Sequence, residues 1–151
     1  MKHPVKFRMF LLSKLPSAYF AGVRIKNLDG DLCQVTIPYK WFSQNPFRST
    51  YFACLGMAAE MSTGALAMAH LYKRKPSVSM LVTGLEASFI KKATDLTTFT
   101  CKDGSLISRA IMDSIESGEG KTVRAKSVGT NNSGEIVTEF YITWSFKAKK
   151  I

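Results

Sequence analysis

The sequence predicts an α+β fold in which an antiparallel sheet wraps around one long apolar helix. Two observations lead to this fold class. Residues 51–72 form an apolar run of 22 residues that is interrupted only by Glu60 and His70. From residue 79 onward, apolar and polar residues repeatedly alternate, which is the pattern of half-buried strands. With 151 residues, of which 46% are hydrophobic, the chain is expected to form a single domain over residues 1–151.

The N-terminal part is expected to hold one helix followed by a hairpin. Residues 6–18 carry apolar side chains at helical spacing, and we expect this helix to end near Pro16. Residues 23–27 and 32–39 alternate as strands do. Asp29-Gly30, which lies between them, is a strong signal for a tight turn, so the two strands should pair.

The long helix is predicted to follow a loop at residues 39–50 and to end at Lys73-Arg74-Lys75-Pro76. Cations favour a helix C-terminus, and proline cannot continue the helix. Apolar residues lie on all sides of this helix, so it must be enclosed. One side is a stripe of small residues around a single acid, where another backbone can approach closely: Ala53, Gly56, Glu60, Gly64 and Ala67.

After Pro76 the pattern is mainly that of strands. Residues 105–116 are the exception, because their apolar residues fit either a short helix or an irregular strand insertion. The last two strands should form a hairpin across Asn131-Asn132-Ser133-Gly134. The predicted strands are residues 79–90, 95–102, 122–129 and 135–147.

The central run is long enough to span a membrane, but the sequence favours a core helix. Glu60, Ser62 and Thr63 lie near its middle, and a charged residue at a bilayer centre costs about 2.5–3.5 kcal/mol on insertion scales. In a protein core, a carboxylate is retained when it is hydrogen-bonded, paired or used, and burial raises its pKa. Two interpretations of Glu60 therefore remain open, a structural acid and a functional acid.

Composition limits the partners and the compartment. The formal net charge is +10, which favours an anionic partner such as a phosphorylated cofactor, a nucleic acid or an acidic membrane surface. The three cysteines are widely spaced, which argues against a metal site and for a reducing compartment. The apolar stretch after the basic N-terminus is too short for the core of a signal peptide, so we expect a cytoplasmic protein without membrane insertion.

The segment Asn45-Pro46-Phe47-Arg48-Ser49-Thr50-Tyr51-Phe52-Ala53, followed by Glu60, resembles the acyl-CoA thioesterases of the hotdog superfamily. In the phenylacetate-pathway type, an Asn precedes a Gly, a His-Gly-Gly turn and an acid on the helix. The fifteen-residue spacing from Asn45 to Glu60 is the same. Ala21-Gly22-Val23-Arg24-Ile25 and residues 84–93 are most similar to the hotdog branch designated DUF4442. Here Arg48 replaces the family Gly, and Tyr51-Phe52-Ala53 replaces His-Gly-Gly.

The resemblance implies a hotdog fold with an additional N-terminal helix, and a thioester hydrolase. Glu60 would be the general base, and Asn45 would orient the water or the substrate carbonyl, although Asn45 could instead only shape its loop. Backbone N–H groups at the start of the helix, near Tyr51 and Phe52, would stabilise the oxyanion. The bulk of these two side chains could also obstruct that site.

The resemblance also suggests substrate-binding residues and partners. Ser62 and Thr63 lie close to Glu60 in the sequence and could line the site or only pack the helix. Coenzyme A carries several phosphate charges, and hotdog domains generally pair, which implies a homodimer or a dimer of dimers. No cofactor or metal is implied beyond the coenzyme A thioester. Basic residues that could anchor the phosphates, each of which could equally be a solvated surface cation, are Arg48, Lys73, Arg74, Lys91 and Lys92.

The sequence supports other functions less strongly. The altered turn at Tyr51-Phe52-Ala53 favours a non-catalytic acyl-CoA-binding or interaction module as the alternative. Nucleic-acid binding rests on the net charge and on aromatics such as Trp41, but the basic residues are scattered and no RNA-binding motif is visible. A hotdog dehydratase would require a catalytic histidine, and neither His3 nor His70 lies where that chemistry needs it.

Overall fold

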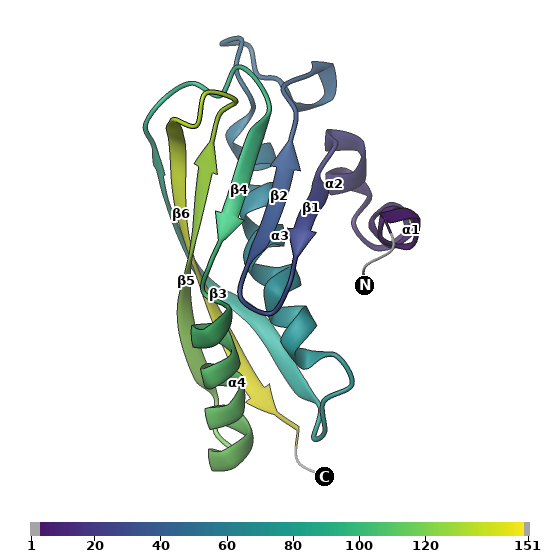
Figure 1. Ribbon diagram of the computed structural model, residues 1–151, viewed down its shortest axis with the longest axis vertical. Helices are drawn as coiled ribbons and strands as arrows, with labels where there is room; N and C mark the ends of the chain where they lie inside the picture. Colours follow the sequence, from purple (N-terminus) through teal and green to yellow (C-terminus); the bar gives the residue numbers. More distant parts are fainter. Residues whose placement is uncertain (1–3, 150–151) are drawn as a thin grey trace.

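The computed structural model describes residues 4–149. In this part of the chain it contains a six-stranded sheet and four α-helices (Figure 1). The elements are, in chain order, α1 (Pro4–Lys14), α2 (Pro16–Ala21), β1 (Arg24–Leu28), β2 (Cys33–Ile37), a 3-10 helix (Trp41–Ser43), α3 (Phe52–Leu71), β3 (Val78–Phe89), β4 (Thr97–Cys101), α4 (Gly104–Ser117), β5 (Lys121–Thr130) and β6 (Ile136–Ala148).

The sheet has the strand order β1-β2-β4-β5-β6-β3, and all neighbours are antiparallel. β1 and β3 are therefore its two edge strands. β3 pairs with β6 over its whole length, from Val78 opposite Ala148 to Phe89 opposite Thr138. Its other edge has no partner within residues 4–149, and it exposes Leu81, Leu85 and Phe89.

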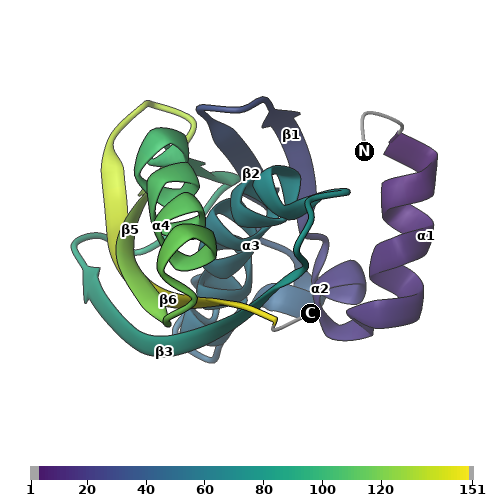
Figure 2. The same ribbon diagram turned by 90° about the horizontal axis from the view of Figure 1, so that it is seen from below.

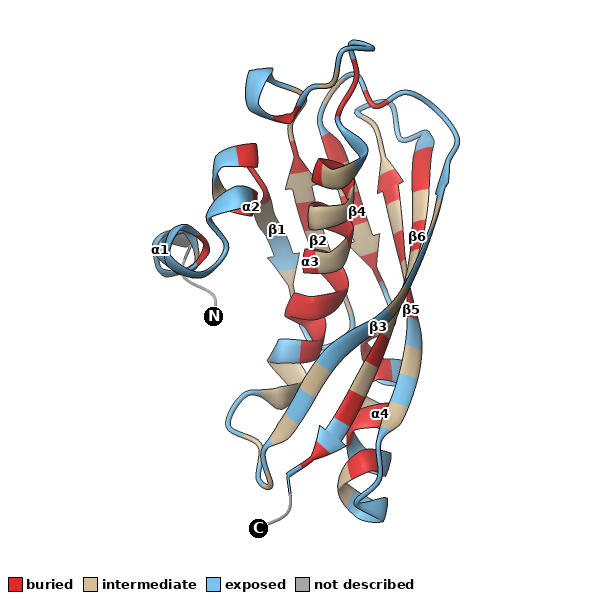
Figure 3. Ribbon diagram, turned by 180° about the vertical axis from the view of Figure 1, so that it is seen from behind, coloured by how far each residue is buried: buried red, intermediate tan, exposed pale blue. Residues whose placement is uncertain are grey.

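The sheet curls around α3, as the view along the molecule shows (Figure 2). Alternate residues of the inner strands point at the helix and are buried, among them Val35 of β2, Phe99 of β4 and Ile142 of β6. Viewed from behind, most of α3 is buried or half-buried, whereas β3 is exposed or half-buried along its length (Figure 3). The predicted α+β arrangement of a sheet around one long helix is confirmed.

α3 matches its predicted bounds closely. It begins after Tyr51, which has extended backbone angles, and ends at Tyr72, directly before Lys73 with a positive φ of 57°. By length and apolarity α3 qualifies as a membrane span, with a mean hydropathy of 1.3 over its most apolar window. However, 61% of that window is buried inside the fold, which is the behaviour of a core helix.

The N-terminal segment differs from its prediction. We expected one helix over residues 6–18, but the structure has two short helices, α1 and α2. The first helix does end close to Pro16, at Lys14, but Pro16 then occupies the first position of α2, where its missing N–H costs nothing. Gly22, with a φ of 93°, ends α2 and turns the chain into β1. α1 is anchored by Leu11, which is fully buried.

Residues 105–116, for which two structures were open, form most of α4. Ile107, Ala110, Ile111 and Ser114 are buried at helical spacing and pack on β5, β6 and α3. A side chain on Gly104 could not be accommodated, because its Cβ would lie 2.2 Å from the backbone oxygen of Gly30. This close approach holds the start of α4 against the β1–β2 turn.

Candidate active site

The loop before α3 is shaped by Asn45. Its side-chain oxygen accepts hydrogen bonds from the backbone N–H groups of Phe47 at 2.9 Å and Ser49 at 3.2 Å. Its side-chain amide donates to the Ser49 hydroxyl at 3.1 Å, and its backbone N–H donates to the Ser49 carbonyl at 2.9 Å. The carboxamide of Asn45 is therefore engaged in holding the turn, which is the loop-shaping role.

Arg48 stands in this turn with a positive φ of 58°. Only glycine adopts such angles without steric cost, so the backbone here has the conformation for which the family Gly is suited. The loop is joined to the segment after β3, because the N–H and hydroxyl of Thr50 donate to the Ala93 carbonyl at 2.8 and 3.1 Å. Lys92 also donates to the Phe47 carbonyl at 3.2 Å.

The start of α3 leaves backbone donors unused. The carbonyl of Tyr51 accepts hydrogen bonds from the N–H groups of Cys54 and Leu55. The N–H groups of Phe52 and Ala53 precede the first intrahelical bond, and no acceptor for them lies within residues 4–149. The rings of Tyr51 and Phe52, 45% and 58% exposed, stand beside these donors. Two oriented N–H groups at a helix N-terminus are suited to an anion or an oxyanion.

Glu60 is half-buried on α3, and its carboxylate makes no hydrogen bond or ion pair within the described chain. Loss of solvent around this carboxyl raises its pKa above the ordinary value. The carboxyl folds toward Gly64, where an added Cβ would lie 3.1 Å from Glu60 Oε1 and 3.1 Å from the Trp144 ring. The structural interpretation of Glu60, an acid satisfied by a strand or an arginine, therefore finds no support in its contacts.

Ser62 and Thr63 are fully buried, and both hydroxyl groups are hydrogen-bonded. The Ser62 hydroxyl donates to the Ala59 carbonyl at 2.7 Å and lies 2.7 Å from the Ser127 hydroxyl of β5. The Thr63 hydroxyl donates to the Glu60 carbonyl at 3.0 Å and accepts a hydrogen bond from the Trp144 indole at 2.9 Å. Both side chains join α3 to the sheet, and Thr63 also fixes Trp144 beside Glu60.

The five basic residues suggested as phosphate anchors lie at opposite ends of α3, which is about 30 Å long. Arg48 and Lys92 flank the loop before the helix, with Lys91 paired to Glu135 nearby. Lys73 and Arg74 follow the other end. There the Arg74 guanidinium donates to the His70 carbonyl and to Met112 Sδ, both at 2.9 Å, and Lys73 lies over the Tyr72 ring.

Aromatic residues that sequence reasoning did not assign to the site continue from the start of α3 into the core. Phe52 contacts Phe89 of β3 edge to face, Phe89 contacts Phe140 of β6, and Phe140 contacts Phe99 of β4. The ring centroids are 6.4, 5.8 and 5.8 Å apart in that order. The alternation of residues 79–90 placed Phe89 on a strand face, but nothing in the sequence paired that face with the helix start.

The cysteines are not candidates for a nucleophile. Cys33, Cys54 and Cys101 are free and buried, as the sequence suggested. Burial raises the pKa of Cys33 to about 12 and that of Cys101 to about 11, so their thiols stay protonated and inert near neutral pH.

Solved structures share this arrangement over nearly the whole chain. A Pseudomonas aeruginosa protein described as a "probable thioesterase" superposes with a TM-score of 0.82 at 18% identity, covering 99% of both chains. A Chlorobaculum tepidum protein of unknown function has a TM-score of 0.81 at 17% identity, covering 97% of this chain and 94% of its own. A thioesterase from Haemophilus influenzae has a TM-score of 0.70 at 11% identity, covering 98% and 92%. No curated protein matches the sequence.

A long central helix enclosed by a six-stranded antiparallel sheet, shared with these proteins, defines a hotdog fold. At these identities the structural similarity establishes the fold. Residues 5–146 also match the family model "Domain of unknown function (DUF4442)". The chain belongs to this family, as residues 21–25 and 84–93 indicated.

Proposed function

We propose that this protein is an acyl-CoA thioesterase in which Glu60 is the general base. The observation that carries the proposal is the Glu60 carboxyl itself, which is half-buried, has a raised pKa and has no partner within residues 4–149. A carboxyl kept in this state at a cost to stability is suited to accept a proton near neutral pH. The fold shared with proteins named as thioesterases supports the same reaction class.

The reaction needs only groups that the chain supplies. Glu60 takes a proton from water as the water oxygen attacks the thioester carbonyl carbon. The N–H groups of Phe52 and Ala53 stabilise the negative charge that develops on the carbonyl oxygen. When the tetrahedral intermediate collapses, the C–S bond breaks and the thiolate of coenzyme A leaves. The proton held by Glu60 is then available to the thiolate or to solvent, and a free acid and a thiol are the products.

The donors and the base of one chain are too far apart to serve the same carbonyl. Eight residues separate Phe52 from Glu60, which is about 12 Å along α3. The Glu60 carboxyl folds toward Gly64, away from the helix start, so its side chain does not close this gap. The attacking water must lie within hydrogen-bond distance of the carboxylate and about 3 Å from the carbonyl carbon, while the donors bind the oxygen of the same carbonyl. The base must therefore come from a second copy of the chain.

A homodimer supplies this geometry. β3 is a long edge strand with an unpaired outer edge and exposed Leu81, Leu85 and Phe89, and such an edge is stabilised by pairing with another strand. Antiparallel pairing of two β3 strands about a two-fold axis gives one continuous sheet and sets the two α3 helices antiparallel. The start of one α3 then lies near Glu60 of the other. Two equivalent sites result.

The coenzyme A phosphates are proposed to bind near the start of α3. Arg48 and Lys92 lie at the same end of the helix as the Phe52 and Ala53 donors. The positive end of the helix macrodipole adds to their charge there. Lys73 and Arg74 lie at the far end of the same chain, but an antiparallel partner helix would bring its own copies of these two residues closer.

The test is release of free thiol from a panel of short, long and aromatic acyl-CoAs. Glu60→Gln should lower kcat by about 10²- to 10⁴-fold, because it removes general-base catalysis. Glu116→Gln, on the exposed side of α4, is the matched control and should leave turnover unchanged. Turnover that Glu60→Gln leaves intact contradicts the assignment of the base.

The oxyanion donors can be tested separately with two variants at one position. Phe52→Pro removes the N–H group but suits the fold, because it stands at the first helical position and Tyr51 before it has extended backbone angles. Phe52→Ala removes the ring and keeps the N–H group. Phe52→Pro should lose about 10²- to 10³-fold in kcat, and Phe52→Ala much less.

The alternative is a non-catalytic acyl-CoA-binding module, and the specific observation in its favour is the pair of exposed rings at Tyr51 and Phe52. If these rings block approach to the helix N–H groups, acyl-CoA binds without being hydrolysed. Thermal stabilisation by acyl-CoA together with no thiol release from any substrate of the panel would favour the binding module.

A further inference from the structure

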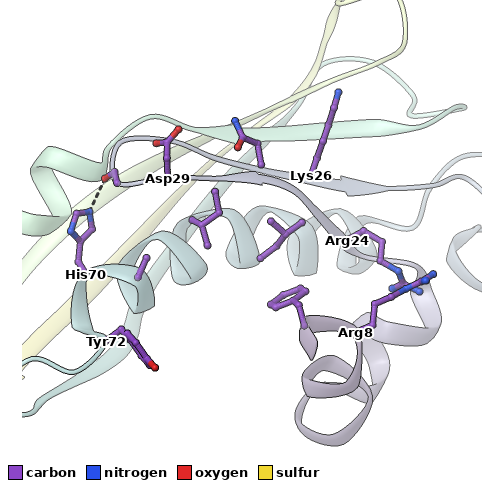
Figure 4. Close-up of a pocket in the computed structure, with 12 residues that line it drawn as sticks. Arg8, Arg24, Lys26, Asp29, His70 and Tyr72 are labelled. Atoms are coloured by element: carbon purple, nitrogen blue, oxygen red, sulfur yellow. Dashed lines mark hydrogen bonds between the residues drawn. The ribbon is translucent and has the colours of Figure 1, made fainter. Parts of the chain in front are cut away.

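A cavity lies outside the proposed active site, between α1, the outer edge of β1 and the last turn of α3 (Figure 4). Its volume is about 990 Å³, at the upper end of the range for small-molecule sites. It is separate from the Glu60 region, because Ala69 on its wall lies nine residues after Glu60, about 14 Å along α3.

One end of this cavity carries two arginines that lie side by side, Arg8 of α1 and Arg24 of β1 (Figure 4). Loss of solvent, together with the nearby charge of Arg8, lowers the pKa of Arg24. No carboxylate within residues 4–149 forms an ion pair with either arginine. Two adjacent guanidinium groups that repel each other would be stabilised by an anion bound between them.

The two arginines differ in the hydrogen bonds that their guanidinium groups make. The Arg24 guanidinium donates to the carbonyls of Val23 at 2.7 Å and Tyr19 at 3.3 Å, and it lies 5.0 Å from the Tyr19 ring centroid. These contacts fix its position at the mouth of the cavity. Arg8 is exposed and makes no hydrogen bond in the described chain, so its donors remain available.

The wall beside the arginines contains apolar side chains, together with Lys26 and Asn27 of β1. Phe7, Ile25 and Leu28 are half-buried there and pack on the edge of the main core, and Ala69 continues this surface toward the other end. At that end His70 donates a 2.8 Å hydrogen bond to the Gly30 carbonyl, and Asp29 also lines the cavity (Figure 4). The cavity thus has a cationic end at Arg8 and Arg24, an apolar surface beside it, and a far end that carries Asp29 and His70.

We propose that this cavity binds an amphiphilic anion, with its carboxylate or phosphate head between Arg8 and Arg24 and its acyl chain along Phe7, Ile25 and Leu28. The ligand chemistry is an anionic head on an apolar chain. It can come from a free fatty acid or from an acidic lipid at a bilayer surface. The site is independent of the proposed hydrolysis, since it uses neither Glu60 nor the start of α3.

The binding test is isothermal titration with dodecanoate and with dodecanol, which has the same chain without the charge. Dodecanoate should bind at least tenfold more tightly than dodecanol. Arg8→Gln should weaken dodecanoate binding about tenfold or more and leave dodecanol binding unchanged, since a lost charge-assisted hydrogen bond is of this size. Lys14→Gln, an exposed cation on α1 outside the cavity, is the matched control and should change neither affinity.

Arg24→Lys provides a second variant that keeps the charge and loses the planar fork, and it should weaken dodecanoate binding while the melting temperature shows whether the fold is kept. Glu60→Gln should bind dodecanoate as the unmodified protein does, which separates this cavity from the proposed active site. Equal affinity for dodecanoate and dodecanol, or dodecanoate binding that Arg8→Gln does not change, would overturn the proposal.

The two sources of the ligand are separated with vesicles. Phosphatidylcholine vesicles containing phosphatidylglycerol are compared with phosphatidylcholine vesicles alone in a co-sedimentation assay, using the protein and Arg8→Gln. Loss of phosphatidylglycerol-dependent binding in Arg8→Gln supports a bilayer lipid as the source. Monomeric dodecanoate binding without vesicle binding supports a free fatty acid. The absence of both kinds of binding overturns the proposal.

Discussion

The carboxyl group of Glu60 lies over Gly64, one turn further along α3, in the space that a side chain would otherwise fill. An added Cβ on Gly64 would lie 3.1 Å from Glu60 Oε1 and 3.1 Å from Trp144 Cζ2. The small residue at position 64 therefore makes room for the acid and the indole together. It also directs the carboxyl away from the start of its own helix, which is why the proposed reaction needs a second subunit.

Substitution at Gly64 should disturb the acid. Gly64→Ala crowds both Glu60 and Trp144, so we expect kcat to fall about tenfold as the carboxyl is displaced. Gly56→Ala is the matched control, because its added Cβ would meet only Phe140 at 3.7 Å, an ordinary contact. Gly56→Ala should raise the free energy of unfolding by about 0.5–1 kcal/mol, the usual gain for Gly to Ala within a helix. Denaturant unfolding and thiol release measure the two effects. A Gly64→Ala variant as active and as stabilised as Gly56→Ala would contradict this placement.

The raised pKa of Glu60 predicts two pH dependences. The folded protein holds the Glu60 proton at pH values where the unfolded chain has released it, so this group lowers the free energy of unfolding as pH rises from the ordinary glutamate pKa to the raised one. Glu60→Gln should remove that contribution, and its stability relative to the unmodified protein should increase with pH over this window. kcat/KM should rise over the same range, because only the ionised carboxyl accepts a proton. Unfolding curves and initial rates, measured from acid to neutral pH, test both dependences. If the free energies of unfolding of the unmodified protein and of Glu60→Gln change in parallel with pH, the raised pKa is contradicted.

The hydroxyl pair of Ser62 and Ser127 should matter for stability and not for turnover. Because Ser62 donates to the Ala59 carbonyl, Ser127 is left as the donor to Ser62 in a fully buried contact of 2.7 Å. Ser62→Ala should cost about 1–2 kcal/mol by leaving Ser127 unsatisfied. The double variant with Ser127→Ala should lose less than the sum of the single variants. A large loss of kcat in Ser62→Ala at unchanged stability would instead place Ser62 in the site.

Two residues have left-handed backbone conformations, and replacing either with glycine should stabilise the protein. Arg48 has a φ of 58° and Lys73 a φ of 57°. Arg48→Gly and Lys73→Gly should each raise the free energy of unfolding by up to about 1 kcal/mol, because they relieve the crowding of Cβ. Arg48→Gly should also raise KM for acyl-CoA, because it removes a guanidinium that is proposed to bind a phosphate. The KM of Lys73→Gly tests in the same way the basic group at the other end of α3. Chemical denaturation and initial rates separate these effects, and a destabilised Arg48→Gly would refute the strain.

Much of the architecture was predictable because local patterns and tertiary structure agree. The apolar run of residues 51–72, bounded by a loop and by cations before Pro76, can be buried only as one long core helix, and α3 matches it at Phe52–Leu71. Alternation and the turn residues Asp29-Gly30 located the first hairpin in the same way. Pro16 correctly marked the end of the first helix, which is at Lys14, but the second helix that begins at Pro16 was missed. Proline can end or begin a helix, and only the packing of α2 shows that it does both here.

The candidate site was predictable only in part, because its geometry depends on contacts between distant segments. The sequence singled out Glu60 and Asn45, and helical geometry placed Gly64 on the same stripe. The sequence could not show that the Asn45 carboxamide is hydrogen-bonded within its own loop. Nor could it show that Trp144, 80 residues further along the chain, lies against Gly64. The five basic residues were grouped by charge alone, and the structure separates them to the two ends of α3.

Mixing of subunits tests whether Glu60 of one subunit acts on a thioester held at the start of α3 of the other. Glu60→Gln and Phe52→Pro homodimers should each be nearly inactive. Unfolded together at equal concentrations and refolded, they should form mixed dimers in which one of the two sites has both an intact base and an intact donor. About a quarter of the unmodified activity should return. A mixture as inactive as its two components would contradict a site shared between subunits.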